Sequence, residues 1–321
     1  MSREAGARRP VTLLREGGRV PHAQRQKAGP ALFLPYLWLL AFFLVPFLIV
    51  LKISFATTAI AMPPYVPVLD LAAGLQGLVA FAHGLTLDGY RLIASDPLYL
   101  ASFLKSLKVA ALVTALLLAL GFPLAYGIAM SPRRWQPILV MAVVLPFWTS
   151  FLIRVYAWIN ILQRDGLFND ALMALHIVDK PVVWLSTDTA VVIGLVYSYL
   201  PFMVLPLYAT LEKLDRSLLE AAADLGCTRS RAFWRVTLPL ALPGIAAGSL
   251  LCFIPITGEF VIPDLLGGSR SLMIGQTVWL EFFENRDWPT ASALAVVLLA
   301  LLMVPMLVYQ RMQQRQLQGM R

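Results

Sequence analysis

Long runs without a charged residue constrain this chain more than any other feature of its sequence. Ala31 to Leu51 is a run of 21 residues, and Val109 to Met130 is a run of 22. A transmembrane α-helix needs about 20 apolar residues to cross the roughly 30 Å hydrocarbon core of a bilayer. Only 14% of the residues are charged and 59% are hydrophobic, whereas soluble domains average about 25% charged residues. The sequence therefore predicts an all-α integral membrane protein.

Six membrane-spanning helices are expected. The first is read as a retained signal anchor, because its apolar run is longer than that of a signal peptide and no small-residue cleavage site follows it. Pro201 and Pro206 are expected to break the fourth helix, since proline cannot donate to the preceding turn. The six apolar ranges are 31–51, 109–130, 137–161, 189–211, 240–258 and 291–309.

These spans divide the chain into five expected parts, with a periplasmic loop whose structure the sequence does not determine. Pro63, Pro64 and Pro67 lie in that loop, and prolines at this density favour turns. The parts are a basic tail at 1–30, a first transmembrane helix at 31–55, the periplasmic loop at 56–100, a main transmembrane domain at 101–310, and a second tail at 311–321.

The distribution of basic residues predicts the orientation. Seven Lys and Arg residues lie in 1–30, two in the turn at 131–135, five between spans four and five, and three after residue 310. These 17 of the 26 basic residues lie on one side if the N-terminus is cytoplasmic, and cytoplasmic loops carry the excess of Lys and Arg. Both termini are therefore expected in the cytoplasm. The net charge of +8 is explained by topology and requires no nucleic-acid partner.

The charged segment between spans four and five has the pattern of a short helical hairpin. Ser217 and Glu220 form a candidate capping box that opens one helix. Gly226 is expected to end that helix in the left-handed conformation. Thr228 is a candidate N-cap for a second helix, and Pro239 is expected to end it. Such a pair of short helices cannot bury a core of its own and needs a partner.

The same segment resembles the EAA loop of type I ABC importer permeases. Glu220-Ala221-Ala222 is followed after three residues by Gly226, and after nine more by Val236-Thr237-Leu238-Pro239. The sequence departs from the family pattern at Val236, where Ile is more usual. The resemblance implies the six-helix, MetI-like permease fold of that family. It also implies that residues 212–239 form a cytoplasmic coupling loop that docks on an ATPase.

The partners and coupling residues follow from this resemblance. It implies a cytosolic ATPase dimer that binds ATP and Mg²⁺, a second homologous permease subunit and a periplasmic binding protein. This chain has no G-x-x-x-x-G-K-[ST] motif, so no catalysis and no cofactor are expected on it. Leu225 and Phe233 could fill the ATPase groove or pack the underside of the hairpin. The implied coupling residues are Glu220, Ala221, Ala222, Leu225, Gly226 and Phe233.

Four further segments resemble the polyamine branch of these permeases, and within it the putrescine-type subunit of the bacterial inner membrane. They are residues 145–158, 199–208, 258–268 and 281–289. Spermidine, an amino acid derivative or another organic cation remains an alternative cargo. An ion-coupled secondary transporter is a further alternative, but it would not need the EAA-type loop.

A cationic cargo also has a direct chemical argument. Carboxylates and aromatic faces stabilise ammonium groups away from water. Glu259 and Asp264 lie beside helix-interrupting glycine and proline residues, and broken helices line many transport pathways. The aromatic candidates for the same pathway are Trp148, Tyr156 and Tyr199.

Each of these candidates also has a simpler interpretation. The two carboxylates could instead cap the fifth helix at the water interface, and the aromatic residues could belong to an interfacial belt. Arg154 would repel a diamine, so it is expected at the interface or in an ion pair. The two cysteines and three scattered histidines show no disulfide framework and no metal-ligand spacing.

Overall fold

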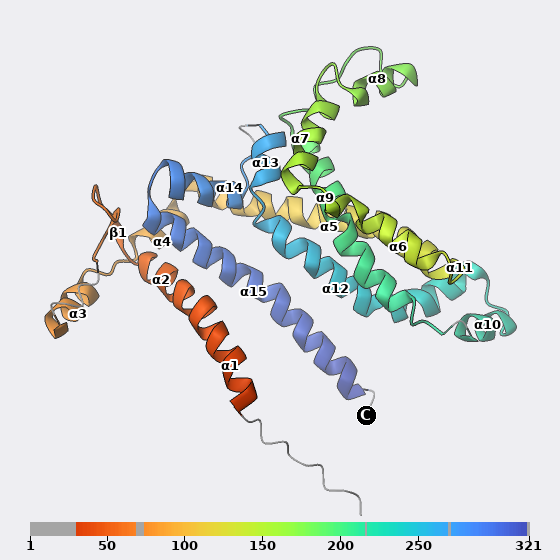
Figure 1. Cartoon of the computed structure of the whole chain (residues 1–321), viewed down its shortest axis with the longest axis horizontal. Coiled ribbons are helices and arrows are strands. Elements are labelled where there is room, and N and C mark those ends of the chain that lie inside the picture. The colour runs from red at the N-terminus through yellow and green to blue at the C-terminus, as the bar shows by residue number, and fades with distance from the viewer. Residues whose placement is uncertain (1–29, 69–73, 216, 269–270, 320–321) are drawn as a thin grey trace, which may run out of the picture. The chain divides into compact units, whose positions relative to one another are not determined.

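The computed structural model describes residues 30–68, 74–215, 217–268 and 271–319, drawn in colour in Figure 1. The chain divides into two units, one ending at Leu48 and one beginning at Ile49. The first unit holds α1 (Pro30–Leu39), a π-helical turn η1 (Leu40–Leu44) and the start of α2 (Val45–Ile53). Its large apolar side chains are exposed, Phe43 by 64%, as expected of a helix whose solvent is lipid.

The second unit is almost entirely helical. Its elements are β1 (Thr57–Thr58), β2 (Tyr65–Val66), α3 (Gly74–His83), α4 (Asp88–Ser95), α5 (Pro97–Met130), α6 (Gln136–Val144), η2 (Leu145–Trp148), α7 (Phe151–Leu162), α8 (Leu167–Ala174), α9 (Asp188–Leu211), α10 (Ser217–Asp224), α11 (Arg229–Ala232), η3 (Phe233–Thr237), α12 (Leu238–Thr257), α13 (Val261–Leu266), α14 (Ile274–Trp279), η4 (Leu280–Glu284) and α15 (Trp288–Gly319).

Five helices in the described residues are long and apolar enough to cross a membrane, and the bent pair made by α6–η2 and α7 brings the number to six. The predicted number of spans is therefore confirmed if this pair counts as one span. The final apolar helix runs from Trp288 to Gln314 and is therefore longer than the expected span of 291–309.

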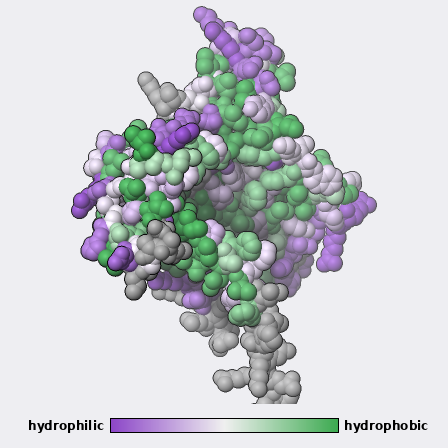
Figure 2. Space-filling model, turned by 60° about the vertical axis from the view of Figure 1, so that its left-hand side comes forward, coloured by the Kyte–Doolittle hydropathy of each residue, from purple (hydrophilic) through white to green (hydrophobic). Residues whose placement is uncertain are grey.

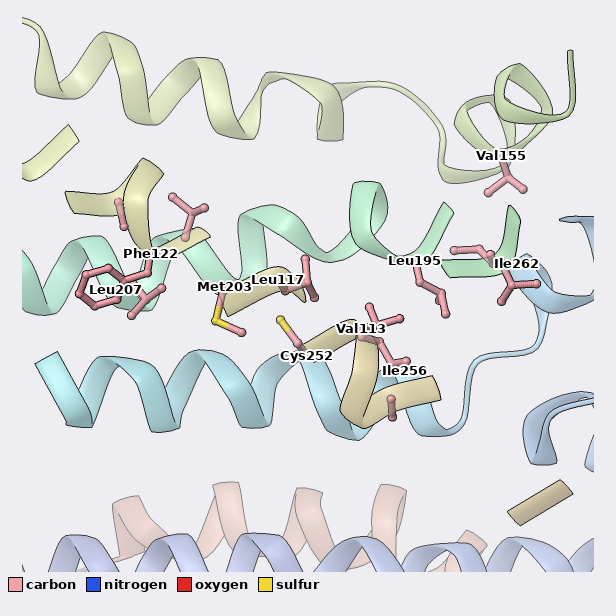
Figure 3. Close-up of a cluster of buried hydrophobic side chains, with 14 of the residues drawn as sticks. Val113, Leu117, Phe122, Val155, Leu195, Met203, Leu207, Cys252, Ile256 and Ile262 are labelled. Atoms are coloured by element: carbon pink, nitrogen blue, oxygen red, sulfur yellow. The ribbon is translucent and has the colours of Figure 1, made fainter. Parts of the chain in front are cut away.

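The core lies where α5, α9 and α12 pack on one another, and Figure 3 shows their side chains converging between the helices. Leu117, Met203 and Cys252 come from these three helices and are fully buried. A Cβ atom built on Gly121 or Gly248 would lie 2.9 Å from the Met203 side chain. Small residues thus let the backbones approach closely, which favours association where lipid offers no hydrophobic driving force.

The expected break in the fourth span is wrong. Helix α9 is continuous from Asp188 to Leu211, with Pro201 and Pro206 inside it. Proline is tolerated here because neighbouring helices and hydroxyl side chains can satisfy the backbone groups it leaves free. Pro201 and Pro206 free the carbonyls of Tyr197 and Phe202, and α9, which contains both prolines, packs against α5 and α12.

The third span, expected as one helix, is bent. The axis turns by 87° between Gln136–Trp148 and Phe151–Leu162. Thr149 and Ser150, between the two helices, adopt extended ψ angles of 152° and 139°. The helix therefore stops and restarts in a new direction.

The predicted helix end at Pro239 is also wrong. Helix α11 passes through the π-helical turn η3 into α12, which gives one helical segment from Arg229 to Thr257. The amide of Leu238 donates to the carbonyl of Phe233, five residues back. This wider turn moves the carbonyls that a proline ring would otherwise meet, so Pro239 falls in the first turn of α12, where proline is favoured.

The predicted periplasmic loop contains short elements. Strands β1 and β2 pair antiparallel, and α3 and α4 follow them. Helix α5 then starts at Pro97, well before the expected start of the second span at Val109. Asp96 caps it, since its Oδ1 accepts a 2.8 Å hydrogen bond from the amide of Leu98, and proline suits the first helical turn.

Candidate functional site

The hairpin turns at Gly226, which has a φ of +76°. The Gly226 amide donates to the carbonyl of Ala223, and the Cys227 amide donates to the carbonyl of Ala222, both over 2.9 Å. These two bonds form a Schellman motif, the common glycine-ended helix terminus. The predicted left-handed glycine is therefore confirmed.

The start of the hairpin helix differs from the expected capping box. Asp215 Oδ1 accepts a 2.9 Å hydrogen bond from the amide of Ser217, so Asp215 caps the helix and Ser217 is its first residue. This amide, together with the Ser217 hydroxyl, lowers the pKa of the Asp215 carboxyl below its usual value. At the second helix the prediction is confirmed, because Thr228 Oγ1 accepts from the amide of Arg231 over 3.4 Å.

The two apolar residues with alternative roles lie on different sides of the hairpin. Phe233 packs edge-on against Phe122 and Tyr126 of α5, with ring centroids 5.6 and 6.1 Å away. Leu225 is 87% exposed at the elbow, and Trp234, which the sequence analysis did not select, is 64% exposed. Phe233 therefore packs the hairpin against α5, and Leu225 is available to a partner.

The second candidate site begins where α12 ends. Helix α12 stops at Thr257, and the half-buried Glu259 follows. Glu259 Oε2 accepts a 2.6 Å hydrogen bond from the Tyr199 hydroxyl of α9, and its Oε1 accepts from the amide of Val261 over 3.1 Å. The structure thus joins two of the predicted pathway residues.

The backbone around Glu259 is held by close packing of α14. A Cβ atom on Gly275 would overlap the carbonyl oxygen of Gly258 and lie 2.7 Å from that of Glu259. Only glycine permits this approach. The carboxylate is therefore presented from a fixed break in the helix.

The other three predicted pathway residues lie elsewhere. Asp264 is exposed, and its Oδ1 accepts a 3.0 Å hydrogen bond from Gln276, which links α13 to α14. Trp148 in η2 and Tyr156 in α7 are 73% and 54% exposed, and neither lines the cavity that Tyr199 lines.

That cavity has a volume of about 840 Å³. It opens between η2–α7, α9, α12 and α15, and among the described residues Arg154 is the only charged residue in its wall. Hydrophobic residues, drawn green, border a hollow on the face of the molecule seen in Figure 2. Several residues of the cavity wall could not be predicted from the sequence, because they stand in apolar segments that resemble any membrane span. They include Ser198, Phe202, Ile254, Met306 and Tyr309.

A buried asparagine organises the segment between α7 and α9. Asn169 is fully buried. Its Nδ2 donates to the carbonyls of Gln163, Arg164 and Val182, and its Oδ1 accepts from the amide of Val182 and the indole of Trp184. One side chain therefore fixes the fold of this loop.

We expect Asn169→Ala to loosen this loop, because several buried backbone groups lose their partner at a cost of about 1–3 kcal/mol each. Trypsin should then cut faster after Arg164 in the purified protein. Asn160→Ala is the matched control, since Asn160 is exposed and donates once, to the carbonyl of Tyr156. Equal cleavage rates in the two variants would contradict the proposed role of Asn169.

The sequence and the fold match known transport proteins. Residues 31–319 match the family model of the binding-protein-dependent transport system inner membrane component. The chain is 39% identical to the spermidine/putrescine transport system permease protein PotB of Escherichia coli K12 over 85% of its own length and 93% of that protein. It is equally similar to PotB of Haemophilus influenzae, with 85% and 90% covered. The predicted resemblance to polyamine-branch permeases is therefore confirmed.

Solved structures agree on the fold. A bacterial alginate ABC transporter bound to a periplasmic protein carrying an alginate pentasaccharide matches with a TM-score of 0.68 and 17% identity, over 89% of this chain and 93% of that one. An inward-facing form of the MetNI methionine ABC transporter matches with a TM-score of 0.50 and 16% identity, over 69% and 98%. The chain therefore belongs to the family of binding-protein-dependent transport system inner membrane components, the multi-pass permeases of ABC importers.

Proposed function

We propose that this chain is the permease subunit of an ATP-driven importer that moves polyamines across the inner membrane, with putrescine as the preferred cargo. The main observation in favour of a polyamine cargo is the hydrogen-bonded pair of Glu259 and Tyr199, which lies at a helix break beside a cavity lined by aromatic residues. The names of its 39% identical relatives, spermidine/putrescine permeases, support the same class.

The pair suits an ammonium group for three reasons. The Glu259 carboxylate provides charge, and the C-terminal end of α12 adds the negative end of a helix dipole beside it. Tyr199 and Phe202 line the neighbouring cavity, and aromatic faces attract cations. Each ammonium group of a diamine could therefore replace its hydrating water with the Glu259 carboxylate and the aromatic rings in turn.

The partners of the complex are part of the proposal. A cytosolic ATPase dimer supplies ATP and Mg²⁺, a second permease completes the pathway, and a periplasmic binding protein delivers the cargo. Both termini and the hairpin face the cytoplasm. Arg133 and Lys213 line one cavity of about 880 Å³, so the basic turn after α5 and the start of the hairpin lie at the same end of the bundle, in agreement with the charge distribution.

The continuous helix suggests how a movement of the ATPase is transmitted to the cargo site. The 29 residues from Arg229 to Thr257 span about 43 Å at roughly 1.5 Å per residue. One end carries the hairpin, and the other ends at Thr257, two residues before Glu259. Movement of the docked hairpin is therefore transmitted to the carboxylate along one helix, while Phe233 carries part of it to α5.

Leu225→Ser should weaken ATPase docking. A leucine buried at an interface contributes about 1.5–3 kcal/mol, so we expect the affinity for the ATPase to fall about tenfold or more. The measurement is the binding of purified ATPase to the permease in nanodiscs. Leu167→Ser in α8 is the control, because Leu167 is 73% exposed on the opposite side of the proposed membrane. Unchanged binding in the Leu225 variant would count against this contact.

The complete proposal is tested by reconstitution. The complex with its ATPase is placed in liposomes, and uptake of radiolabelled putrescine is measured with saturating binding protein, with and without ATP. ATP-dependent uptake that unlabelled putrescine inhibits better than spermidine is expected. Uptake that follows an ion gradient without ATP would overturn the proposed class, and uptake of neither polyamine would overturn the cargo.

A further inference from the structure

Helix α5 holds the start of α14, the helix that packs against the break at Glu259. Ser106 of α5 is fully buried, and its Oγ accepts a 2.8 Å hydrogen bond from the amide of Ile274. Ile274 is the first residue of α14, and the amides of a first helical turn have no acceptor within their own helix. Ser106 therefore supplies from another helix the acceptor that α14 itself cannot provide.

The residues just before α14 are held at a second point. Ser271 is 3% exposed, and its hydroxyl donates to the Asp188 carboxylate at the start of α9. Lys105 Nζ lies 2.8 Å from the same carboxylate oxygen. Two neighbouring residues of α5 thus hold this segment, Ser106 directly and Lys105 through Asp188.

The side chain of Ile274 fixes the same point by packing. It is fully buried in an apolar cluster that contains Tyr99 and Phe103 of α5 and Leu294 of α15. Because protein interiors are close-packed, such a side chain can shift only if its neighbours shift with it. The first turn of α14 is therefore fixed to α5 by both a side chain and an amide.

Gly275, the next residue, is in direct contact with the break before Glu259. A Cβ atom on Gly275 would lie 2.7 Å from the carbonyl carbon of Gly258 and 2.7 Å from the carbonyl oxygen of Glu259. With the two backbones this close, a shift of α14 either moves Gly258 and Glu259 or opens a gap beside them. Two successive contacts thus lead from Ser106 to the residue that carries the carboxylate.

We infer that Ser106 is a positioning residue for Glu259. It acts through α14, which supports the backbone that presents the carboxylate to Tyr199. Phe122, further along α5, packs against Phe233 of the hairpin, so α5 connects the hairpin to Glu259 by a second route beside α12. The effect on transport rests on the proposed function, whereas the effect on the geometry of the break does not.

The first test measures amide hydrogen exchange in the intact complex and requires no cargo. Ser106→Ala should speed exchange in residues 272–280, because the Ile274 amide loses its acceptor, and in residues 258–263, because the break loses its support. We expect an increase of about tenfold in both segments, since exchange follows the free energy of local opening. Ser102→Ala is the matched control and should change neither segment. Ser102 lies one turn earlier in α5, is 2% exposed, and donates to the carbonyl of Leu98 in its own helix.

The second test separates positioning from a general loss of stability. Ser106→Ala should raise the KM of putrescine uptake about threefold to tenfold, because the carboxylate that binds the cargo is displaced. Two residues that act through one group have non-additive effects, so adding Ser106→Ala to Glu259→Gln should lower uptake by less than about twofold further. Gly275→Ala disturbs the second contact and should give the same exchange pattern and the same non-additivity.

Two results would overturn the inference. Faster exchange in residues 272–280 with unchanged exchange in residues 258–263 would show that Ser106 caps α14 without positioning Glu259. An additive loss of uptake in the double variant would leave Ser106 with a structural role alone. If exchange changes as expected but the original complex takes up no polyamine, the proposed cargo is wrong and the positioning role stands.

Discussion

Gly226→Val should abolish most transport while the protein still inserts in the membrane. Gly226 has a φ of +76°, and no atom lies within 4 Å of the position a Cβ would take. The effect therefore arises from the backbone and not from a clash. A β-branched residue in the left-handed region costs about 1–2 kcal/mol or more, which reduces the population of the correct elbow by a factor of about 5–30.

Leu225 at the elbow is 87% exposed, so the loss of the elbow should appear in ATPase binding before it appears in folding. The measurements are the affinity of the ATPase for the permease in nanodiscs and the thermal stability of the permease alone. We expect a fall in affinity of about tenfold with little change in stability. Gly226→Asn is the control, because asparagine adopts the left-handed region more readily than other residues with a side chain. If the valine variant binds the ATPase as well as the asparagine variant does, the backbone conformation at Gly226 is not required.

Glu259→Gln should reduce polyamine uptake about tenfold to a hundredfold. The amide oxygen of glutamine can accept from the amide of Val261 while its NH2 group donates to the Tyr199 hydroxyl oxygen, so both contacts can be kept while the charge is lost. Hydrogen bonds to charged groups contribute about 1.5–3 kcal/mol, and each 1.4 kcal/mol is a factor of ten in affinity. The measurement is the rate and KM of radiolabelled putrescine uptake in proteoliposomes.

Two matched variants separate charge from structure. Tyr199→Phe removes the hydroxyl that holds Glu259 and keeps the aromatic face, so a smaller loss is expected. Asp264→Asn removes a carboxylate whose oxygen already bridges to Gln276, and asparagine can accept the same bond. Uptake by the Glu259 variant with the original KM and rate would show that this carboxylate does not meet the cargo. An equal loss in the Asp264 variant would show that both carboxylates act on the pathway.

The two predictions address opposite ends of the same helix. Gly226 lies before it at the hairpin elbow, and Glu259 lies two residues after its end at Thr257. The π-helical turn Phe233–Thr237 keeps the segment continuous. Such turns often occur at functional positions. Here it allows Pro239 in the helical segment that we propose transmits the movement of the hairpin.

The local sequence determined the features that depend on local chemistry. A run of about 20 apolar residues must be a helix in lipid, because every backbone group needs a partner within the segment. The left-handed conformation of Gly226 and the cap at Thr228 follow from the residue types at those positions. The presence of the apolar spans, the hairpin elbow and the carboxylate beside the helix break were therefore predictable.

Tertiary packing decided the rest. Whether Pro201, Pro206 and Pro239 break their helices depends on the surroundings of the backbone groups they affect. Pro201 and Pro206 lie inside α9, which packs against α5 and α12, and the π-helical turn before α12 accommodates Pro239. The bond from Tyr199 to Glu259 joins residues 60 positions apart, so no local pattern specifies it. The position of Arg154 in the cavity wall, where no other described residue is charged, likewise depends on how α7, α9, α12 and α15 pack. Hydrophobic periodicity gives each helix its place in the membrane, but only the packed bundle determines which polar groups find partners within the chain and which still require one.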